Sequence, residues 1–211
     1  MSINVQAITF SYPEAAKPVL QDFSCNFFSG EIVAITGKNG CGKTTLSKLL
    51  VGILKPQQGS ILIDDINIAG KSLYTIGQKI GYIWQNPAQQ LFCPTAEEEI
   101  AFGLTLQGFP EAEIRSQTEN LLAAFHLTEQ KHNSPLKLSL GEKQRLALAT
   151  VFTRTLPYLV LDEPTGGLDI RSRRELGLLL QNLAQNNNCG IIFISHERDF
   201  IRRWANRELI L

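Results

Sequence analysis

A glycine-rich segment constrains this chain more than any other feature of its sequence. Residues 37–44 read Gly-Lys-Asn-Gly-Cys-Gly-Lys-Thr and match the pattern G-x-x-x-x-G-K-[ST] without a departure. The apolar run Glu31–Thr36 before this segment predicts a buried strand. After it, leucines at helical spacing predict a helix over Lys43–Leu54, which Pro56 ends. We therefore expect a strand, a tight glycine loop and a helix in that order.

The loop contains the residue types that hold a nucleotide triphosphate. Its glycines let the backbone wrap closely around phosphates, and the N–H groups and helix N-terminus supply positive potential. Lys43 adds a point charge at the β- and γ-phosphates, and the Thr44 hydroxyl is placed to bind Mg²⁺. The loop by itself predicts a P-loop nucleotide-hydrolysing protein, a class that includes kinases, GTPases and motor ATPases.

Charge and hydropathy argue against a protein that binds nucleic acid by bulk charge and against one that spans a membrane. Lys and Arg number 20 and Asp and Glu number 20, so the net charge is zero, which argues against holding nucleic acid by bulk charge. No apolar run approaches the roughly 18 residues of a membrane span. The first residues lack a basic region followed by an apolar stretch, so no signal peptide is expected.

Apolar strands alternate with helical segments along most of the chain. The predicted strands are Ile3–Phe10, Ser24–Phe28, Ser60–Ile63, Ile80–Trp84, Tyr158–Leu161, Gly190–Ser195 and Glu208–Leu211, besides Glu31–Thr36. The segment Pro94–Lys137 is helical in pattern, and further helices are expected over Arg171–Gln185 and Glu197–Trp204. This arrangement predicts a single α/β domain over residues 1–211 with a mostly parallel sheet. Its core is expected to comprise residues 1–85 and 140–211, with an inserted helical subdomain at about 86–139.

A second acidic element follows the strand Tyr158–Leu161. Asp162 and Glu163 end this apolar strand, at the sheet edge where ligands bind in folds of this type. Asp162 is expected to reach Mg²⁺, directly or through water. Glu163 is expected to polarise a water for in-line attack on the γ-phosphate.

Three further segments narrow the class. Ser139-Leu140-Gly141-Glu142 opens a helix, Pro164–Asp169 follows the acidic pair, and Ile194-Ser195-His196 ends the next strand. Together with the P-loop and Gln85, these segments resemble the nucleotide-binding domain of ABC ATPases in order and spacing over essentially the whole chain. The resemblance implies a P-loop core, antiparallel N-terminal strands and an inserted helical subdomain.

The resemblance also implies a role for each matching residue. Glu163, His196 and Gln85 are expected to be catalytic, and Thr44, Gln85 and Asp162 to hold Mg²⁺. Asp169 is expected at the dimer seam. The residues expected to bind ATP are Tyr12, Gly37, Asn39, Gly40, Cys41, Gly42, Lys43, Thr44 and Thr45. For Tyr12, stacking under adenine and ordinary strand packing both remain open.

The segment Ser139–Glu142 resembles the ABC signature, which in the family binds the γ-phosphate of the opposite subunit's ATP. Ser139 with Glu142 is also a capping box, so the segment is expected to start a helix. The family has glycine where this chain has Leu140 and glutamine where it has Glu142. Leu140 either crowds the partner's phosphate or points into the helical subdomain.

One segment indicates a branch of the family. Gln85-Asn86-Pro87-Ala88-Gln89-Gln90-Leu91-Phe92 followed by Thr95–Gly103 resembles the ATPase subunits of energy-coupling factor (ECF) and cobalt-type importers. Those transporters take up vitamins or metal ions. Leu91, Phe92 and Phe102 are expected either in the subdomain core or in a groove for a membrane subunit.

The resemblance implies partners and a location. We expect a second ABC ATPase subunit, identical or homologous, a transmembrane coupling subunit and a substrate-binding membrane subunit, with the chain peripheral on the cytoplasmic face. The chain ends directly after the last predicted strand, without the C-terminal segment that many ECF ATPases use in dimerisation. ATP alone is therefore expected to hold the dimer, unless the sequence is truncated. The alternatives are an ABC ATPase acting on nucleic acid or ribosomes and a partly degenerate structural subunit.

Overall fold

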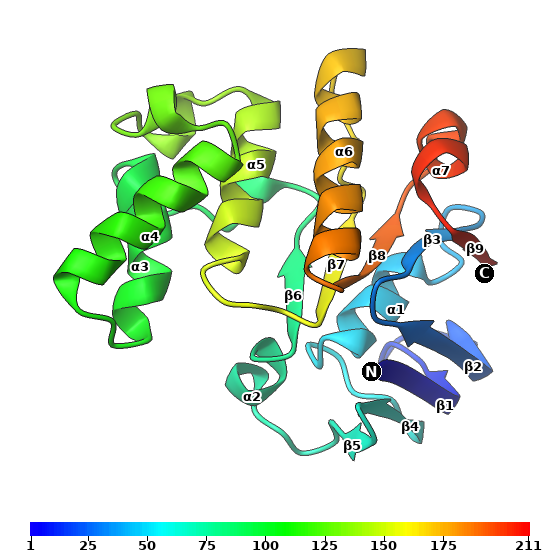
Figure 1. Cartoon of the computed structure of the whole chain (residues 1–211). Coiled ribbons are helices and arrows are strands. Elements are labelled where there is room, and N and C mark those ends of the chain that lie inside the picture. Colours follow the sequence, from blue (N-terminus) through cyan, green and yellow to red (C-terminus); the bar gives the residue numbers. More distant parts are fainter. The chain divides into compact units, whose positions relative to one another are not determined.

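The computed structural model describes residues 1–211 and divides into two compact units (Figure 1). Unit 1 comprises Met1–Tyr82, Leu156–Thr165 and Gly177–Leu211, and unit 2 comprises Ile83–Thr155 and Gly166–Leu176. Each unit is described by itself below.

A five-stranded sheet forms the centre of unit 1. Its order is β6 (Ile80–Ile83), β7 (Tyr158–Asp162), β8 (Gly190–Ile194), β3 (Ile32–Thr36) and β9 (Arg207–Ile210). The pairs β7–β8, β8–β3 and β3–β9 are parallel. Every residue of β3, β7 and β8 is buried, as expected for continuous apolar runs covered on both faces. The predicted parallel sheet is confirmed.

An antiparallel sheet forms the other layer of unit 1, in the order β2 (Leu20–Phe28), β1 (Ser2–Phe10), β4 (Gln58–Ile63) and β5 (Ile66–Asn67). The predicted start of β2 at Ser24 was wrong by four residues. Asp22 has a φ of 48° and the register with β1 shifts nearby, so the alternation of apolar residues is broken there.

The helices of unit 1 include α1 (Lys43–Leu50), α2 (Leu73–Gly77) and α7 (Arg198–Trp204). The prediction that α1 continues to Leu54 was wrong. Gly52 has a φ of 75° and its N–H donates to the Leu49 carbonyl, which closes the helix before Pro56 is reached. A longer helix, α6 (Ile170–Asn186), has its first seven residues in unit 2 and its remainder in unit 1.

Unit 2 is helical, and most of it lies in the chain between β6 and β7, with the start of α6 added. It contains α3 (Ala96–Leu106), α4 (Glu111–Ala124), α5 (Leu140–Val151) and the short 3-10 helices η1 (Pro87–Gln89), η2 (Thr128–Gln130) and η3 (Pro135–Lys137). Helix α3 packs against both α4 and α5. A Cβ on Gly103 of α3 would lie 2.9 Å from the hydroxyl of Thr153, two residues after the end of α5. The sequence assigned α5 to the core from residue 140, whereas it groups with unit 2 through this packing.

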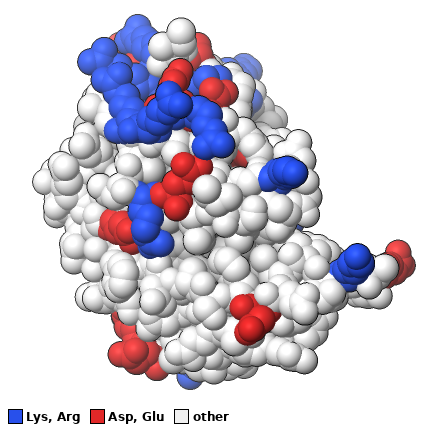
Figure 2. All heavy atoms as spheres, turned by 90° about the vertical axis from the view of Figure 1, so that its right-hand side faces the viewer, with Lys and Arg blue, Asp and Glu red and all other residues white.

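The face of the molecule that Figure 2 shows carries both positively and negatively charged side chains. Helix α7 lies on that side, where Lys and Arg side chains gather in one part while most of the face is uncharged (Figure 2). None of the helices combines the length and the hydropathy that a membrane span requires.

Candidate active site

The glycine-rich loop between β3 and α1 has the backbone that only glycine tolerates well. Gly37, Gly40 and Gly42 have φ values of 140°, 80° and 105°. A Cβ on Gly42 would also lie 2.8 Å from Cγ1 of Val19. Gly42 precedes α1 and no side chain caps that helix, so the first N–H groups of α1 have no side-chain acceptor at the N-cap. This helix start is the kind that binds phosphate.

Lys43 lies across the loop rather than extending into solvent. Its ammonium donates to the carbonyl oxygens of Gly37, at 3.1 Å, and Lys38, at 3.0 Å. The side chain is buried and its partners are neutral. Lys43 forms no ion pair, although its charge acts to lower the pKa of the nearby Asp162 and Glu163 carboxyls, and its ammonium remains available to a phosphate.

Asp162 at the end of β7 lies directly beside the start of α1. The Thr44 hydroxyl donates to its Oδ1 at 3.2 Å, and the Tyr82 hydroxyl donates to its Oδ2 at 3.2 Å. Burial raises the pKa of Asp162, and these two hydrogen bonds oppose that shift. Tyr82 is a site residue that sequence reasoning missed, because a tyrosine inside a buried strand carries no motif.

The oxygen atoms of Thr44 and Asp162 fit a magnesium ion. Mg²⁺ prefers hard oxygen ligands and is usually bound through one or two carboxylates plus substrate phosphates. No group of three or more His, Cys, Asp or Glu residues is arranged to hold a metal ion by itself. The protein therefore supplies few ligands here. This suits an ion whose remaining ligands come from the nucleotide phosphates, and not an ion that is coordinated by protein groups alone.

Glu163 and His196 face each other across the ends of β7 and β8. Nε2 of His196 lies 3.1 Å from Oε1 of Glu163. Glu163 has a φ of 50°, and its N–H donates to the carbonyl of Ile194 on the neighbouring strand. Burial raises the pKa of the Glu163 carboxyl, and the charge of His196 opposes this. A half-buried carboxylate held in this way is suited to accept a proton.

Two hydroxyls hold the segments that follow these strands. Thr165 and Ser195 are both fully buried, and their hydroxyl oxygens are 2.9 Å apart. The Ser195 hydroxyl also accepts the N–H of Glu197. The residues beside Glu163 and His196 are thus fixed to each other by a buried hydrogen bond.

A cavity of about 280 Å³ opens beside this group. It is lined by Thr36, Gly37, Lys38, Ser195, His196, Arg198, Ile201 and Ile210. The P-loop backbone and the His196 side chain therefore share one open space.

Tyr12 lies against the second threonine of the P-loop. Its hydroxyl is 3.2 Å from the Thr45 hydroxyl, and its ring meets that of Phe10 edge to face at 5.1 Å. Tyr12 as a whole is 41% exposed, so packing in the fold does not bury all of its surface. The P-loop residues Asn39 and Gly40 are also exposed, and Cys41 donates its N–H to the Lys38 carbonyl.

The remaining predicted site residues belong to unit 2. Gln85 lies between β6 and η1 and is exposed. Ser139 caps α5: its hydroxyl accepts the Glu142 N–H, and the Glu142 carboxylate accepts both the N–H and the O–H of Ser139, at 2.8 and 2.7 Å. The predicted capping box is confirmed. These bonds from Ser139 lower the pKa of Glu142.

The start of α5 lies close to the segment that leads into α6. A Cβ on Gly167 would be 2.9 Å from Cδ2 of Leu140, and a Cβ on Gly141 would be 3.0 Å from the Ser172 hydroxyl. Asp169 accepts the N–H of Ser172 at 2.7 Å and so caps α6, a bond that lowers its pKa. The Leu140 side chain therefore points toward Gly167.

Unit 2 also carries an exposed aromatic pair. The rings of Phe92 and Phe102 meet edge to face at 5.1 Å, and Phe92 is 68% exposed. The buried Glu99 carboxylate accepts the N–H groups of Phe92 and Cys93, at 2.8 and 2.6 Å. Leu91, Phe92 and Phe102 were expected either in the subdomain core or in a groove for a membrane subunit. Of these three residues, Leu91 is buried and belongs to the core.

Comparisons with known proteins agree with this geometry. The family model described as "ABC transporter" matches residues 20–166. The chain is 39% identical over 209 residues to a putative ABC transporter ATP-binding protein of Pyrococcus furiosus, covering 99% of this chain and 79% of that protein. It is 37% identical over 201 residues to the energy-coupling factor transporter ATP-binding protein EcfA1 of Thermotoga maritima, covering 95% and 75%.

A solved structure is also similar. It is cbiO1 from Clostridium perfringens, described as part of the ABC transporter complex cbiONQ. The TM-score is 0.90 at 32% sequence identity, and the match covers 99% of this chain and 83% of that one. The likeness therefore extends over the whole chain.

Proposed function

The chain belongs to the ABC transporter family as one of its ATP-binding, ATP-hydrolysing proteins, and on that basis we propose that it powers an ECF-type importer of a vitamin or a metal ion. The observation that carries the catalytic part is the group at the carboxyl end of the parallel sheet. Thr44 lies 3.2 Å from Asp162, and His196 lies 3.1 Å from Glu163. These pairs bring a P-loop hydroxyl, two carboxylates and an imidazole to one sheet edge.

The P-loop would hold the triphosphate. The N–H groups at the start of α1 and the Lys43 ammonium would bind the β- and γ-phosphates. Tyr12 offers an exposed ring face for the adenine. Thr44 and Asp162 would hold Mg²⁺, with Gln85 as a further oxygen ligand. When bound, the ion neutralises charge on the phosphate oxygens.

Glu163 would act as the base for hydrolysis. Its carboxylate would orient a water in line with the γ-phosphate and take up the proton as the oxygen–phosphorus bond forms. His196 would donate a hydrogen bond to the γ-phosphate and keep the Glu163 carboxylate oriented. The bond to the β-phosphate oxygen breaks, which releases inorganic phosphate and leaves ADP.

A second ATPase subunit would complete each site. In this arrangement Ser139, Leu140, Gly141 and Glu142 face the ATP on the partner's P-loop, and Asp169 lies at the seam. The Glu142 carboxylate already occupies the Ser139 hydroxyl and N–H, so this signature would meet a γ-phosphate with a like charge beside it. This favours a heterodimer with unequal sites over a symmetric homodimer.

The aromatic pair of unit 2 would dock the transmembrane coupling subunit. Phe92 and Phe102 are exposed apolar rings, and Glu99 holds the backbone that carries Phe92. Trp84 and Leu106 add exposed apolar surface in the same unit. Docking there, together with a substrate-binding membrane subunit, would place the chain on the cytoplasmic face of the membrane as a peripheral subunit.

Two experiments test this proposal separately. Purified wild-type chain is expected to hydrolyse Mg-ATP, and Glu163→Gln to bind ATP without turning it over; equal rates would reject the catalytic assignment. For the membrane part, tagged chain is purified with its detergent-solubilised complex. Phe92→Ala with Phe102→Ala is expected to release the polytopic subunits, whereas the exposed aromatic of unit 1 in Phe28→Ala is expected to retain them. Recovery of nucleic acid or ribosomes in place of membrane subunits would favour the alternative class.

A further inference from the structure

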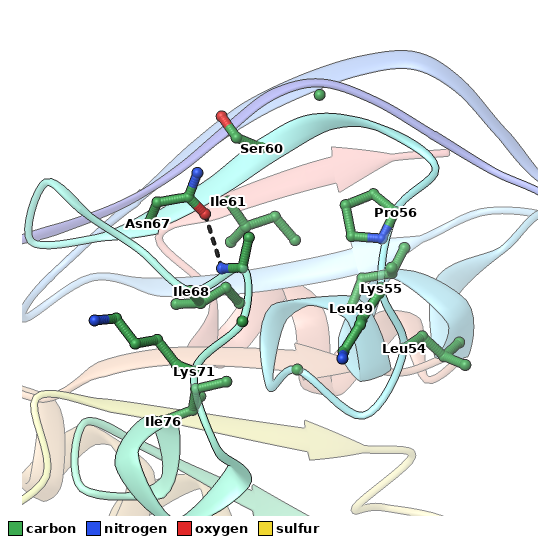
Figure 3. A pocket seen from close by; sticks show the side chains of 14 residues that line it. Leu49, Leu54, Lys55, Pro56, Ser60, Ile61, Asn67, Ile68, Lys71 and Ile76 are labelled. Atoms are coloured by element: carbon green, nitrogen blue, oxygen red, sulfur yellow. Dashed lines mark hydrogen bonds between the residues drawn. The ribbon is translucent and has the colours of Figure 1, made fainter.

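A second cavity of unit 1 lies at the far end of α1 from the P-loop. Its volume is about 190 Å³ (Figure 3). It is enclosed by the last turn of α1, the strands β4 and β5, and α2. Its lining includes none of the predicted nucleotide, metal or signature residues. It is therefore separate from the candidate active site.

The floor of this cavity is apolar. Leu49, Ile61 and Ile76 are buried and face it, and Ile68 closes one side (Figure 3). A Cβ on Gly52 would lie 2.4 Å from Cδ1 of Ile76, so glycine at this position allows α2 to approach α1. The floor therefore suits an apolar body that makes close contact on several sides.

The rim carries positive charge and no negative charge. Lys55 and Lys71 line the cavity, neither takes part in an ion pair, and no Asp or Glu is among the lining residues. In Figure 3 the Lys55 side chain runs alongside Leu49 toward the other lining residues, whereas Lys71 extends away from them. Lys55 is exposed and has no carboxylate partner, so its ammonium is available to the anionic group of a ligand in the cavity.

Asn67 shapes one wall of the cavity. Its side-chain oxygen accepts the N–H of Ala69 at 2.8 Å, which fixes the turn after β5 (Figure 3). In Figure 3 the amide nitrogen of Asn67 points away from Lys55, so the charge of a ligand is assigned to Lys55 alone.

Size limits the ligand further. A cavity of about 150 Å³ with an apolar lining holds benzene, so about 190 Å³ holds one ring or branched chain with a carboxylate. We propose that this cavity is a binding site for a small apolar carboxylate, held by Leu49, Ile61 and Ile76 on its body and by Lys55 on its charge. The proposal does not depend on ATP hydrolysis or on the transporter branch.

Titration of the full chain with sodium benzoate, followed by ¹H–¹⁵N NMR, tests the proposal. Saturable shifts are expected at the amides of Gly52, Gly59 and Gly70, with a dissociation constant of about 1–10 mM for a probe of this size. Benzyl alcohol, which has the same ring without the charge, is the matched probe and is expected to bind more weakly at the same amides.

Variants of the chain separate the contribution of the Lys55 charge to ligand binding from that of the space in the cavity. Lys55→Gln is expected to weaken benzoate about fivefold while leaving benzyl alcohol unchanged, and Lys17→Gln, an exposed lysine of unit 1 without an ion pair, is expected to weaken neither. Ala69→Leu is expected to fill the cavity and abolish both shifts, with the dispersion of the spectrum showing that the chain is folded. Shifts that grow linearly over many surface amides, or equal loss in Lys55→Gln and Lys17→Gln, would overturn the proposal.

Discussion

Nε2 of His196 lies 3.1 Å from Oε1 of Glu163, although the two residues are separated by the whole of α6 and β8 in the chain. Neighbouring parallel strands produce this pairing. Asp162 at the end of β7 pairs in register with Ile194 of β8, and the Glu163 N–H donates to the Ile194 carbonyl. The sheet register therefore brings the backbone at the ends of β7 and β8 together, directly before Glu163 and His196.

The first prediction concerns His196. If His196 donates to the γ-phosphate and orients Glu163, His196→Ala lowers the rate of hydrolysis about 100-fold, within the range of a positioned proton-transfer group. The affinity for ATP, measured with a fluorescent analogue, is expected to change less than threefold. His132→Ala, an exposed histidine of unit 2 with a Glu97 contact, is the control. An unchanged rate in His196→Ala would remove this role.

The second prediction concerns stability and pH in the nucleotide-free chain. Burial raises the pKa of Glu163 above the ordinary value of 4.5, so the folded chain binds more protons than the unfolded chain from about that pH upward to the raised value. The free energy of unfolding therefore falls as the pH rises through this window. Below it, both states are protonated and the effect disappears.

Glu163→Gln removes this titration. It is expected to raise the melting temperature relative to wild type at pH 7, by a margin that shrinks as the pH approaches 4. Glu14→Gln, at an exposed residue, serves as the control and is expected to show no such trend. A margin that grows on acidification would contradict the raised pKa of Glu163.

Much of the fold followed from local patterns, and the rest did not for identifiable reasons. The strands β3, β7 and β8 are continuous apolar runs, so their burial in a parallel sheet was predictable. The two-residue strand β5 and the five-residue helix α2 were not predicted, because elements this short show no periodicity. The cavity between them was consequently invisible to the sequence. The early end of α1 did have a signal, Gly52, which the later Pro56 obscured.

The residues of the candidate site also divide into those that the sequence predicted and those that it did not. Motifs indicated Lys43, Thr44, Asp162 and Glu163, because their chemistry requires those residue types at that spacing, whereas His196 was indicated by the resemblance to ABC ATPases. Tyr82 could not be inferred, since its hydrogen bond to Asp162 joins residues 80 positions apart through the pairing of strands. The direction of the Leu140 side chain, toward Gly167, likewise depends on how α5 packs beside the start of α6.

The third prediction concerns the metal. Thr44→Ala removes the hydroxyl that lies 3.2 Å from Asp162 and leaves the P-loop backbone in place. The Mg²⁺ concentration that gives half-maximal hydrolysis is therefore expected to rise about tenfold, the effect of losing one contact worth about 1.4 kcal/mol. Thr44→Ser keeps the hydroxyl and is expected to stay close to wild type. If Thr44→Ala shows the wild-type Mg²⁺ dependence, Thr44 is not a metal ligand.

The fourth prediction separates backbone strain from crowding in the P-loop. Gly40 has a φ of 80° and a Cβ there would have no atom within 4 Å, whereas Gly42 has a φ of 105° and a Cβ there would lie 2.8 Å from Cγ1 of Val19. Gly40→Ala is expected to lower the free energy of unfolding by about 1 kcal/mol from the positive φ alone, and Gly42→Ala by about 2–3 kcal/mol. Urea denaturation measures both. Val19→Ala added to Gly42→Ala is expected to recover part of the difference; no recovery would mean that crowding is not the cause.

The fifth prediction concerns the Ser139–Glu142 pair and rests on the proposed dimer. The Glu142 carboxylate accepts both the hydroxyl and the N–H of Ser139, and its lowered pKa keeps it charged at neutral pH. Glu142→Gln in the Glu163→Gln background keeps the cap through the amide oxygen and removes the charge that faces the partner's γ-phosphate. Mg-ATP is then expected to drive self-association about fivefold more tightly, near the upper limit of ~1 kcal/mol for an exposed charge pair. Sedimentation at several protein concentrations measures this, with Glu111→Gln on α4 as the control. Weaker association in Glu142→Gln would mean that the carboxylate supports the signature as a helix cap and does not compete with the phosphate.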